Sequence, residues 1–303
     1  MAETTAVLTA LTAPVITDIQ QIVSAATTVD SVSPLSEAFL LALGPSRPGV
    51  IHVARSDAVE GLVGYAQITS DGSAELVVDP AARHSGHGRA LLDAVLAQGA
   101  TGVWSHGRLP AAAALADSAG LVVGRELLKM ERTLGPDDLA DPVLPQGWTS
   151  TTFAGLPDVK ALQRVNAAAF AHHREQGRLT VADLRERMAQ PWFDPSGLFW
   201  LRREDDPPGA EPAAFHWTKI EPDSTTGEVY VVGVHPDAQG RGLAGPLTRL
   251  GLQHLAAQGC TAVELYVDGD NAPALATYLR QGFHVVESHV VFVRDGVPGQ
   301  AST

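Results

Sequence analysis

The chain has 303 residues, enough for one large domain or two of about 150 residues each. Its hydrophobic content of 45% is ample for packed cores, and its net charge of −13 argues against a nucleic-acid or an anionic-membrane partner. Cys260 is the only cysteine, which excludes an intrachain disulfide and fits a reducing compartment. Residues 1–4 carry no basic segment and no run of about 18 apolar residues occurs, so we expect no signal peptide, no membrane span and a cytoplasmic protein.

Hydrophobic periodicity and turn residues predict mixed helices and strands along the whole chain. In the first half, helices are expected at residues 13–26, 36–43, 88–97 and 111–117, and strands at 50–54, 62–68, 74–78, 102–104 and 121–134. Residues 135–142 carry turn formers and acids without periodicity. The second half repeats the order, with helices at 159–171, 181–189, 242–257 and 273–280, and strands at 197–201, 213–220, 228–234, 262–267, 283–286 and 289–293.

Two landmarks recur at nearly the same spacing, which indicates a tandem repeat. Gly86 and Gly242 are 156 residues apart, and Gly120 and Gly282 are 162 residues apart. Such offsets are far longer than the period of a solenoid, so the repeating unit is a whole domain. We expect an N-terminal domain over residues 1–136, a linker over 137–146 and a C-terminal domain over 147–303.

A glycine-rich turn follows a strand and opens a helix in each half. The stronger copy covers residues 239–245 and the weaker one covers residues 83–88. Such a loop exposes backbone N–H groups at a helix N-terminus, which favours a phosphate or pyrophosphate. An ordinary strand–turn–helix connection is the alternative. The stronger loop lacks the Gly-Lys-Ser/Thr of a P-loop, and the preceding strands do not open a Rossmann βαβ unit.

Four landmarks in the second half, taken in order, resemble the GCN5-related N-acetyltransferase (GNAT) family. They are Val232-Gly233-Val234-His235-Pro236, Gln239-x-x-Gly242-x-Ala244, Tyr266-Val267-x-x-x-Asn271 and Tyr278-x-x-x-Gly282-Phe283. The resemblance implies an α/β fold of two tandem GNAT domains. Each would be a twisted, mixed, six- to seven-stranded sheet with helices on both faces. It also implies acetyl-CoA as co-substrate, held where two central parallel strands splay apart.

By the same resemblance, three segments of the second half bind acetyl-CoA. The thioester and pantetheine would lie along Val232, Gly233 and Val234, the pyrophosphate at Gln239, Gly240, Arg241, Gly242, Leu243, Ala244 and Gly245, and the other wall would be Asn271, Ala272, Pro273, Ala274, Leu275 and Ala276. The matching residues of the first half are Leu76, Val77, Val78, His84, Ser85, Gly86, His87, Gly88 and Arg89. The sequence leaves open whether the first half holds CoA or only keeps the fold.

Glu228 and Tyr278 are the candidates for proton transfer. Glu228 begins a strand, where desolvation raises the pKa of a carboxylate towards that of a useful base; an exposed strand-start acid is the alternative. Tyr278 offers a phenol that can protonate a leaving thiolate, or it is a tyrosine that packs on the sheet. The resemblance implies general base and general acid, respectively. Ala116 stands at the matching position of the first half, so we expect that half to be catalytically silent.

A narrower resemblance is to the tandem acetyltransferases that make mycothiol, a low-molecular-weight thiol. It rests on Phe215-His216-Trp217-Thr218-Lys219 and on residues 227–234 and 170–177. It implies acetylation of the cysteinyl amine of cysteinyl-glucosaminyl-inositol, with the substrate in contact with Glu37, Glu175, Lys219, Glu228 and Tyr266. His173-Arg174 departs from the pattern of this group just before Glu175. Plain surface charge is the alternative for Glu175 and Lys219.

Two further interpretations stay open at this point. In the first, the enzyme acetylates another small amine or a peptide N-terminus. In the second, both halves are non-catalytic and the protein is a CoA-binding sensor. The histidines show no metal-binding spacing, so we expect no metal. The predicted partner is a small-molecule thiol-glycoside amine, with no nucleic acid and no membrane, and we expect a monomer.

Overall fold

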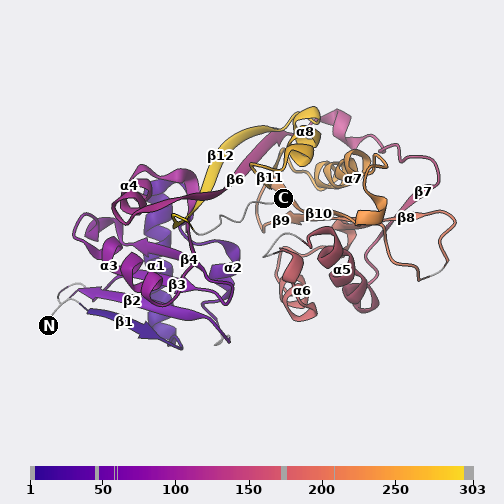
Figure 1. Cartoon of the computed structure of the whole chain (residues 1–303). Helices are drawn as coiled ribbons and strands as arrows, with labels where there is room; N and C mark the ends of the chain where they lie inside the picture. The colour runs from indigo at the N-terminus through magenta and orange to yellow at the C-terminus, as the bar shows by residue number, and fades with distance from the viewer. Residues whose placement is uncertain are drawn as a thin grey trace. The chain divides into compact units, whose positions relative to one another are not determined.

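The computed structural model describes residues 4–44, 48–57, 59, 61–171, 176–207 and 209–296. These residues form two compact units (Figure 1). Unit 1 contains the described residues up to 127 together with 288–296, and unit 2 contains 128–287. This division differs from the expected boundaries, because strands β6 (Leu121–Thr133) and β12 (His284–Arg294) each contribute one part to each unit. Residues expected as a linker pack in unit 2, where Asp138 pairs with Arg132 at 2.6 Å.

Unit 1 is a mixed sheet with helices on both faces. Its elements are β1 (Thr4–Leu8), α1 (Ala13–Asp30), α2 (Glu37–Leu41), β2 (Ile51–Asp57), β3 (Gly61–Ile68), β4 (Ser73–Val78), α3 (His87–Ala97), β5 (Gly102–Ser105) and α4 (Pro110–Ser118). The strand order is β1-β2-β3-β4-β5-β12-β6, with β4 parallel to β5. Successive side chains of a strand point to opposite faces. In β3, Ala66 therefore packs with Leu91 of α3, whereas Tyr65 packs with Ile19 of α1.

Unit 2 repeats this order of elements. They are β7 (Trp148–Thr152), α5 (Leu156–Ala169), α6 (Val181–Met188), β8 (Leu198–Arg203), β9 (Ala214–Ile220), β10 (Thr226–Val234), α7 (Ala244–Ala257), β11 (Ala262–Asp268) and α8 (Ala272–Arg280). The strand order is β12-β6-β11-β10-β9-β8-β7, with β10 parallel to β11. Trp200 of β8 packs with Leu162 of α5, and the next residue, Leu201, packs with Leu247 of α7. The helices of unit 2 therefore also cover both faces of the sheet.

The two long strands, β6 and β12, each contribute residues to both units. In unit 1, the end of β12 lies between β5 and β6, and Val291 is the register partner of Trp104. In unit 2, the end of β6 lies between β11 and β12. Figure 1 shows β6 and β12 side by side. Each sheet is therefore completed by a strand from the other half of the chain.

The predicted α/β class with mixed sheets and helices on both faces is confirmed. Three local expectations differ from the structure. The edge strands β1 and β7 were not predicted, because their residues are mostly exposed and lack apolar alternation. The strands expected at 283–286 and 289–293 form one continuous strand, β12. Helix α7 begins at Ala244 rather than at residue 242, because Gly242 has a φ of +73°, outside the helical region.

Candidate active site

The two central parallel strands of unit 2 separate near their middle. Within the described residues, the ladder between β10 and β11 runs only from Thr226 to Val229. A bulge at Tyr230 follows, and β10 then continues beside β9 alone, to Val234. Bulges commonly re-aim side chains or end strand pairing next to active sites. This is the splay that the sequence resemblance implied, and it opens the sheet beside the glycine loop.

The glycine loop after β10 has the conformation that its glycines allow. Gly240 and Gly242 have φ values of +72° and +73°, which side chains rarely adopt. A Cβ atom at Gly240, Gly242 or Gly245 would meet no other atom within 4 Å, so this face of the loop borders open space. The loop leads into α7, a helix of 14 residues. Its free backbone N–H groups and helix dipole together suit an anion.

A cavity of about 900 Å³ lies against this loop in unit 2. It is lined by most residues predicted to hold the cofactor, namely Val232, Val234, Gln239, Gly240, Gly242, Leu243, Ala244, Gly245, Asn271, Pro273 and Ala274. The remaining predicted residues are not in the lining: Gly233, Arg241, Ala272, Leu275 and Ala276. A side chain at Gly233 would clash with Phe215, so its close packing is a structural reason for that glycine.

Other residues that line the cavity were not predicted from the sequence. They are Asp141, Val143, Ala238, Pro246, Thr248, Arg249, Thr277, Arg280 and Gln281. Helical spacing offered a signal for two of them, because Thr248 and Arg249 lie one turn beyond the loop residues Ala244 and Gly245. Nothing in the local sequence indicated Asp141, which lies outside every element assigned to the second domain.

Tyr278 lines the same cavity from α8. Burial raises the pKa of its phenol to about 12, so the hydroxyl keeps its proton at neutral pH. Its ring lies edge-on to Phe283, with centroids 5.7 Å apart. The helix that carries it is capped by Asn271, whose Oδ1 accepts a hydrogen bond from the Ala274 N–H at 3.2 Å. Tyr278 thus offers a protonated phenol at the cavity.

Glu228 lies on β10 before the bulge and is 18% exposed. The ammonium of Lys219, on β9, lies 3.9 Å from a Glu228 oxygen and 2.8 Å from Glu221. The same ammonium lies 5.1 Å from the Trp192 ring centroid and 5.5 Å from that of Tyr230. Two carboxylates and two ring faces hold this ammonium in place. Lys219 therefore stands beside the predicted base, with its charge directed at aromatic and acidic groups.

Tyr266 belongs to the same neighbourhood from β11. Its pKa is raised by partial burial first and then by the charges of Glu264 and Glu228. Lys129 lies 5.9 Å from the Tyr266 ring centroid and pairs with Glu264 at 2.7 Å. The structure thus brings Lys219, Glu228 and Tyr266 together on neighbouring strands. Of the other predicted substrate residues, Glu37 begins α2 in unit 1, and Glu175 lies outside the described residues.

In the matching loop of unit 1, the side chains of His87 and Arg89 are engaged within the unit. Gly86 has a φ of +85° and His84 a φ of +63°, so the turn itself is retained. His87 is buried and accepts a hydrogen bond from Arg55 Nε at 3.2 Å, while Arg89 pairs with Asp93 at 2.8 Å. Of the predicted strand residues, Val77 packs in the core with α1. Ser85, Gly86, Gly88 and Val78 remain part of the turn and its flanks.

The first unit contains a much smaller cavity, of about 90 Å³. Leu76 and Ala116 are among its lining residues. Ala116 stands four residues before Gly120, as Tyr278 does before Gly282. An alanine has no proton to donate, so this cavity lacks the phenol of unit 2.

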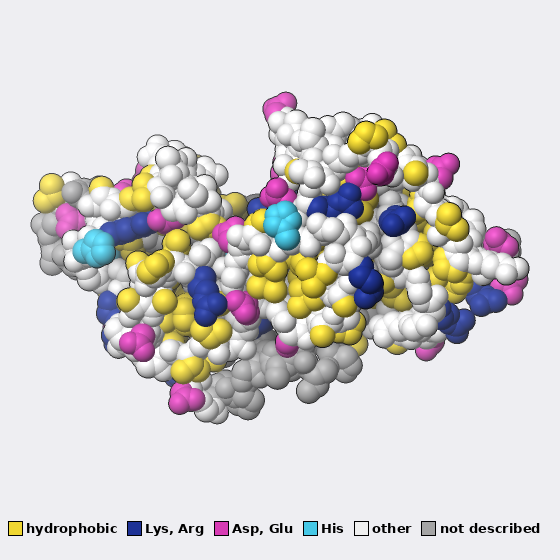
Figure 2. All heavy atoms as spheres, turned by 90° about the horizontal axis from the view of Figure 1, so that it is seen from above, with side chains coloured by type: hydrophobic (Ala, Val, Ile, Leu, Met, Phe, Trp, Pro, Cys, Tyr) yellow, Lys and Arg dark blue, Asp and Glu magenta, His cyan; other side chains and the backbone are white. Residues whose placement is uncertain are grey.

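One face of the surface and the described helices can be examined for features of a membrane protein or a metal site. Basic and acidic side chains are interspersed over the face shown in Figure 2 rather than gathered in a basic field. Among the described residues, no helix combines the length and apolarity that a membrane crossing requires. In the same part of the chain, no three His, Cys, Asp or Glu side chains are grouped as metal ligands.

Comparison with known proteins identifies the class of this fold. A family model described as the Acetyltransferase (GNAT) family matches residues 162–283, and one described as an Acetyltransferase (GNAT) domain matches residues 47–120. A GCN5-related N-acetyltransferase from Sphaerobacter thermophilus has a TM-score of 0.68 at 21% identity and covers 98% of both chains. A tandem GNAT protein from the clavulanic acid biosynthesis pathway has a TM-score of 0.68 at 16% identity, covering 96% of this chain and 97% of its own. The class is therefore a tandem GNAT acyltransferase.

Sequence relatives define the group more narrowly. A mycothiol acetyltransferase from Streptomyces bingchenggensis is 45% identical over 297 residues, covering 94% of this chain and 95% of its own. One from Rhodococcus jostii is 44% identical over 289 residues, covering 91% of this chain and 94% of its own. The chain belongs to the mycothiol acetyltransferase family, within the GNAT enzymes.

Proposed function

We propose that the protein transfers the acetyl group of acetyl-CoA to the cysteinyl amine of cysteinyl-glucosaminyl-inositol. The observation that carries this proposal is the cavity of unit 2, where the glycine loop and the phenol of Tyr278 line one continuous space. The names of the relatives supply the substrate. GNAT acetyltransferases use acetyl-CoA, which provides the activated thioester.

The residues of unit 2 fit this co-substrate. Backbone N–H groups of the loop at Gly240 and Gly242 are suited to the pyrophosphate, since no side chain obstructs them. The apolar side chains of Val232 and Val234 line the same cavity and suit the pantetheine arm. Arg249 and Arg280 add positive charge at the cavity wall, which suits the further phosphate of CoA.

Glu228 is the proposed base that removes a proton from the substrate ammonium, directly or through a water molecule. Lys219, 3.9 Å away, favours its ionised form, which is the form that accepts a proton. Once the amine is neutral it attacks the thioester carbonyl, and polarisation by the backbone of β10 stabilises the developing negative charge. Tyr266 and Lys219 are proposed to contact the substrate beside this base, together with Glu37 and Glu175.

Tyr278 is the proposed general acid. Its raised pKa, about 12, means that the phenol stays protonated until a strong base forms next to it. The thiolate that leaves during acetyl transfer is such a base, and protonation by the phenol prevents its return. In unit 1, Ala116 replaces this phenol, so we propose that unit 1 is catalytically silent. Whether its loop residues bind CoA can be tested by counting bound CoA per chain.

The test is acetyl transfer to purified cysteinyl-glucosaminyl-inositol, followed by release of free thiol, with Glu228→Gln as the base variant. We expect turnover in the native protein and a loss of about 10²–10⁴-fold in kcat for Glu228→Gln. Glu221→Gln is the matched control, because it removes the other carboxylate beside Lys219. Full turnover by Glu228→Gln would refute the base assignment.

The same assay separates the alternatives. Turnover on other amines, such as a polyamine or a peptide N-terminus, at a higher kcat/KM would replace the proposed substrate. CoA binding without turnover on any amine would indicate a sensor.

A further inference from the structure

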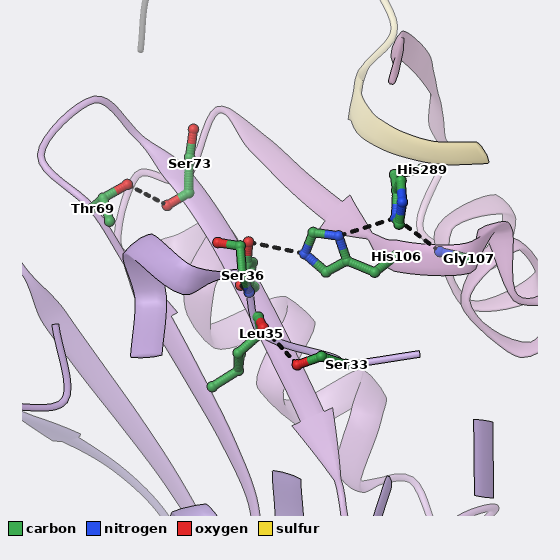
Figure 3. Close-up of polar contacts among 9 residues, drawn as sticks. Ser33, Leu35, Ser36, Thr69, Ser73, His106, Gly107 and His289 are labelled. Carbon is green, nitrogen blue, oxygen red and sulfur yellow. Dashed lines mark hydrogen bonds and ion pairs between the residues drawn. The ribbon is translucent and has the colours of Figure 1, made fainter. Parts of the chain in front are cut away.

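A buried chain of polar groups crosses unit 1 at the strand position that carries the base in unit 2. Glu75 of β4 is 1% exposed, and one of its oxygens lies 3.0 Å from His106 Nε2. Its other oxygen accepts a hydrogen bond from the Ser36 N–H at 2.7 Å. His106 Nδ1 lies 3.3 Å from His289 Nδ1, which also accepts from the Gly107 N–H at 3.1 Å. Figure 3 shows the two contacts, from His106 to His289 and from His289 to the Gly107 nitrogen.

The hydrogen-bond pattern assigns the protons of this chain. The Gly107 N–H donates to His289 Nδ1, so that nitrogen carries no hydrogen. His106 Nδ1 faces the same nitrogen at 3.3 Å, and a hydrogen on His106 Nδ1 makes this contact a hydrogen bond that shares the His289 lone pair with the Gly107 N–H. A further proton is needed between His106 Nε2 and the Glu75 oxygen, because a carboxylate and a bare ring nitrogen would repel at 3.0 Å. The pair thus holds one proton more than a carboxylate and a neutral imidazole.

The surroundings favour an ion pair, with that proton on the imidazole. The Ser36 N–H, at 2.7 Å from the second oxygen, stabilises the ionised carboxylate. The His106 ring is stacked on Trp104, at 5.9 Å and an interplanar angle of 4°, and an aromatic face stabilises a cation. A buried ion pair of this kind needs hydrogen bonds to its remaining atoms, and here both Glu75 oxygens and both His106 nitrogens have them.

The carboxylate of Glu75 fixes the start of α2. This helix has five residues, too few to be stable alone. Ser36 precedes it, and the Ser36 carbonyl accepts the first helical hydrogen bonds, from Phe39 at 3.1 Å and from Leu40 at 2.9 Å. Fixing the Ser36 N–H therefore sets the position of the whole turn, including Glu37, its first residue.

We infer that Glu75 and His106 form a buried positioning pair, in which a doubly protonated His106 holds the Glu75 carboxylate on the Ser36 N–H and so places Glu37. The parallel registers align Glu75 with Glu228 and His106 with Tyr266. The same carboxylate position thus serves as a proposed base in unit 2 and as a helix anchor in unit 1. The part that concerns Glu37 and the amine rests on the proposed function, whereas the pair and the anchoring of α2 do not.

The protonation state is tested first, by ¹⁵N NMR of the histidine rings in the full-length protein at pH 7, with His106→Gln to assign the signals. We expect both His106 nitrogens to carry hydrogen. A single protonated nitrogen on His106 would overturn the inference, and ¹³C NMR of the Glu75 carboxyl group would then show whether Glu75 carries the proton.

The anchoring of α2 is tested by hydrogen exchange. Ser36→Pro removes the N–H that Glu75 accepts, and the φ of Ser36, −71°, is one that proline adopts. We expect amide exchange at residues 39–43 to accelerate about tenfold in Ser36→Pro and in Glu75→Gln, the order of one lost hydrogen bond to a charged group. Asp117→Asn, an exposed carboxylate of the same unit, is the matched control and should leave exchange unchanged. Unchanged exchange in both variants would overturn the anchoring role.

Kinetics test the link to Glu37. Ser36→Pro should raise KM for the amine about tenfold and leave KM for acetyl-CoA and kcat unchanged, since only the placement of Glu37 is altered. An unchanged amine KM beside faster exchange would overturn that link. Absence of turnover in the native protein would instead refute the proposed function, and the NMR and exchange results would still decide on the pair.

Discussion

His216 makes the stability of unit 2 sensitive to acid. It is fully buried on β9, and its Nδ1 donates a hydrogen bond to the Leu247 carbonyl of α7 at 2.9 Å. Burial lowers the pKa of His216 to about 4, from an ordinary value of 6.5. Its Nε2 has no hydrogen-bond partner among the described residues, so a second proton would be buried without an acceptor. The folded state therefore requires the neutral ring.

The size of the effect follows from linkage. Because the folded pKa is depressed, the unfolded chain binds more protons between pH 6.5 and 4, and the free energy of unfolding falls as the pH falls through that range. The shift corresponds to about 3 kcal/mol in total, at about 1.36 kcal/mol for each pKa unit. Between pH 7 and pH 5, about 2 kcal/mol of this is lost. The contribution is fully present above pH 6.5.

The assay is urea unfolding at pH 7 and pH 5, comparing the native protein with His216→Asn. Asparagine keeps an N–H donor near the Nδ1 position but does not titrate, so we expect the variant to lose about 2 kcal/mol less over this interval. Burial also lowers the pKa of His254, but that group is present in both proteins. Tryptophan fluorescence reports mainly on unit 2, which holds Trp148, Trp192, Trp200 and Trp217. Equal losses in the two proteins would refute the reasoning.

Three substitutions test the site and its support. Tyr278→Phe should lower kcat by about 10²–10⁴-fold and leave KM for acetyl-CoA unchanged, because only the acidic proton is removed; steady-state kinetics with native kcat would contradict this. Gly242→Ala should raise KM for acetyl-CoA and lower the free energy of unfolding by about 1–2 kcal/mol, since its φ is +73°; urea unfolding and kinetics measure the two effects. Gly251→Ala should lower the free energy of unfolding by about 1–3 kcal/mol, because a Cβ there would clash with His216. Urea unfolding measures this loss, and native stability would show that α7 can move away.

Local features of the site could be predicted from the sequence. The glycine loop is an example, because a left-handed backbone at Gly240 and Gly242 restricts the residue type that can stand there. The tandem repeat was equally visible, since both halves need the same turn between a strand and a helix. Most residues expected around the cofactor accordingly line the cavity of unit 2.

Contacts between distant segments could not be predicted in this way. Arg249 and Arg280 belong to different helices, and only the packing of α7 and α8 brings both to the cavity wall. Asp141 reaches the same wall from the segment expected as a linker. Nothing in the residues near 130 or 290 indicated that β6 and β12 would each complete a sheet in the other half of the chain.

The carboxylates Glu75 and Glu228 show which properties follow from the local sequence and which follow from the tertiary structure. The sequence by itself determined that each stands near the start of a strand before a glycine turn, because that depends on residues next to one another. Only the tertiary structure decided that Glu75 is enclosed by Ser36 and His106, which are 39 and 31 residues away, whereas Glu228 lies beside Lys219 and Tyr266. Hydrogen bonds and charges act through space over a few ångströms, so the chemical role of a carboxylate is set by the neighbours that folding brings to it.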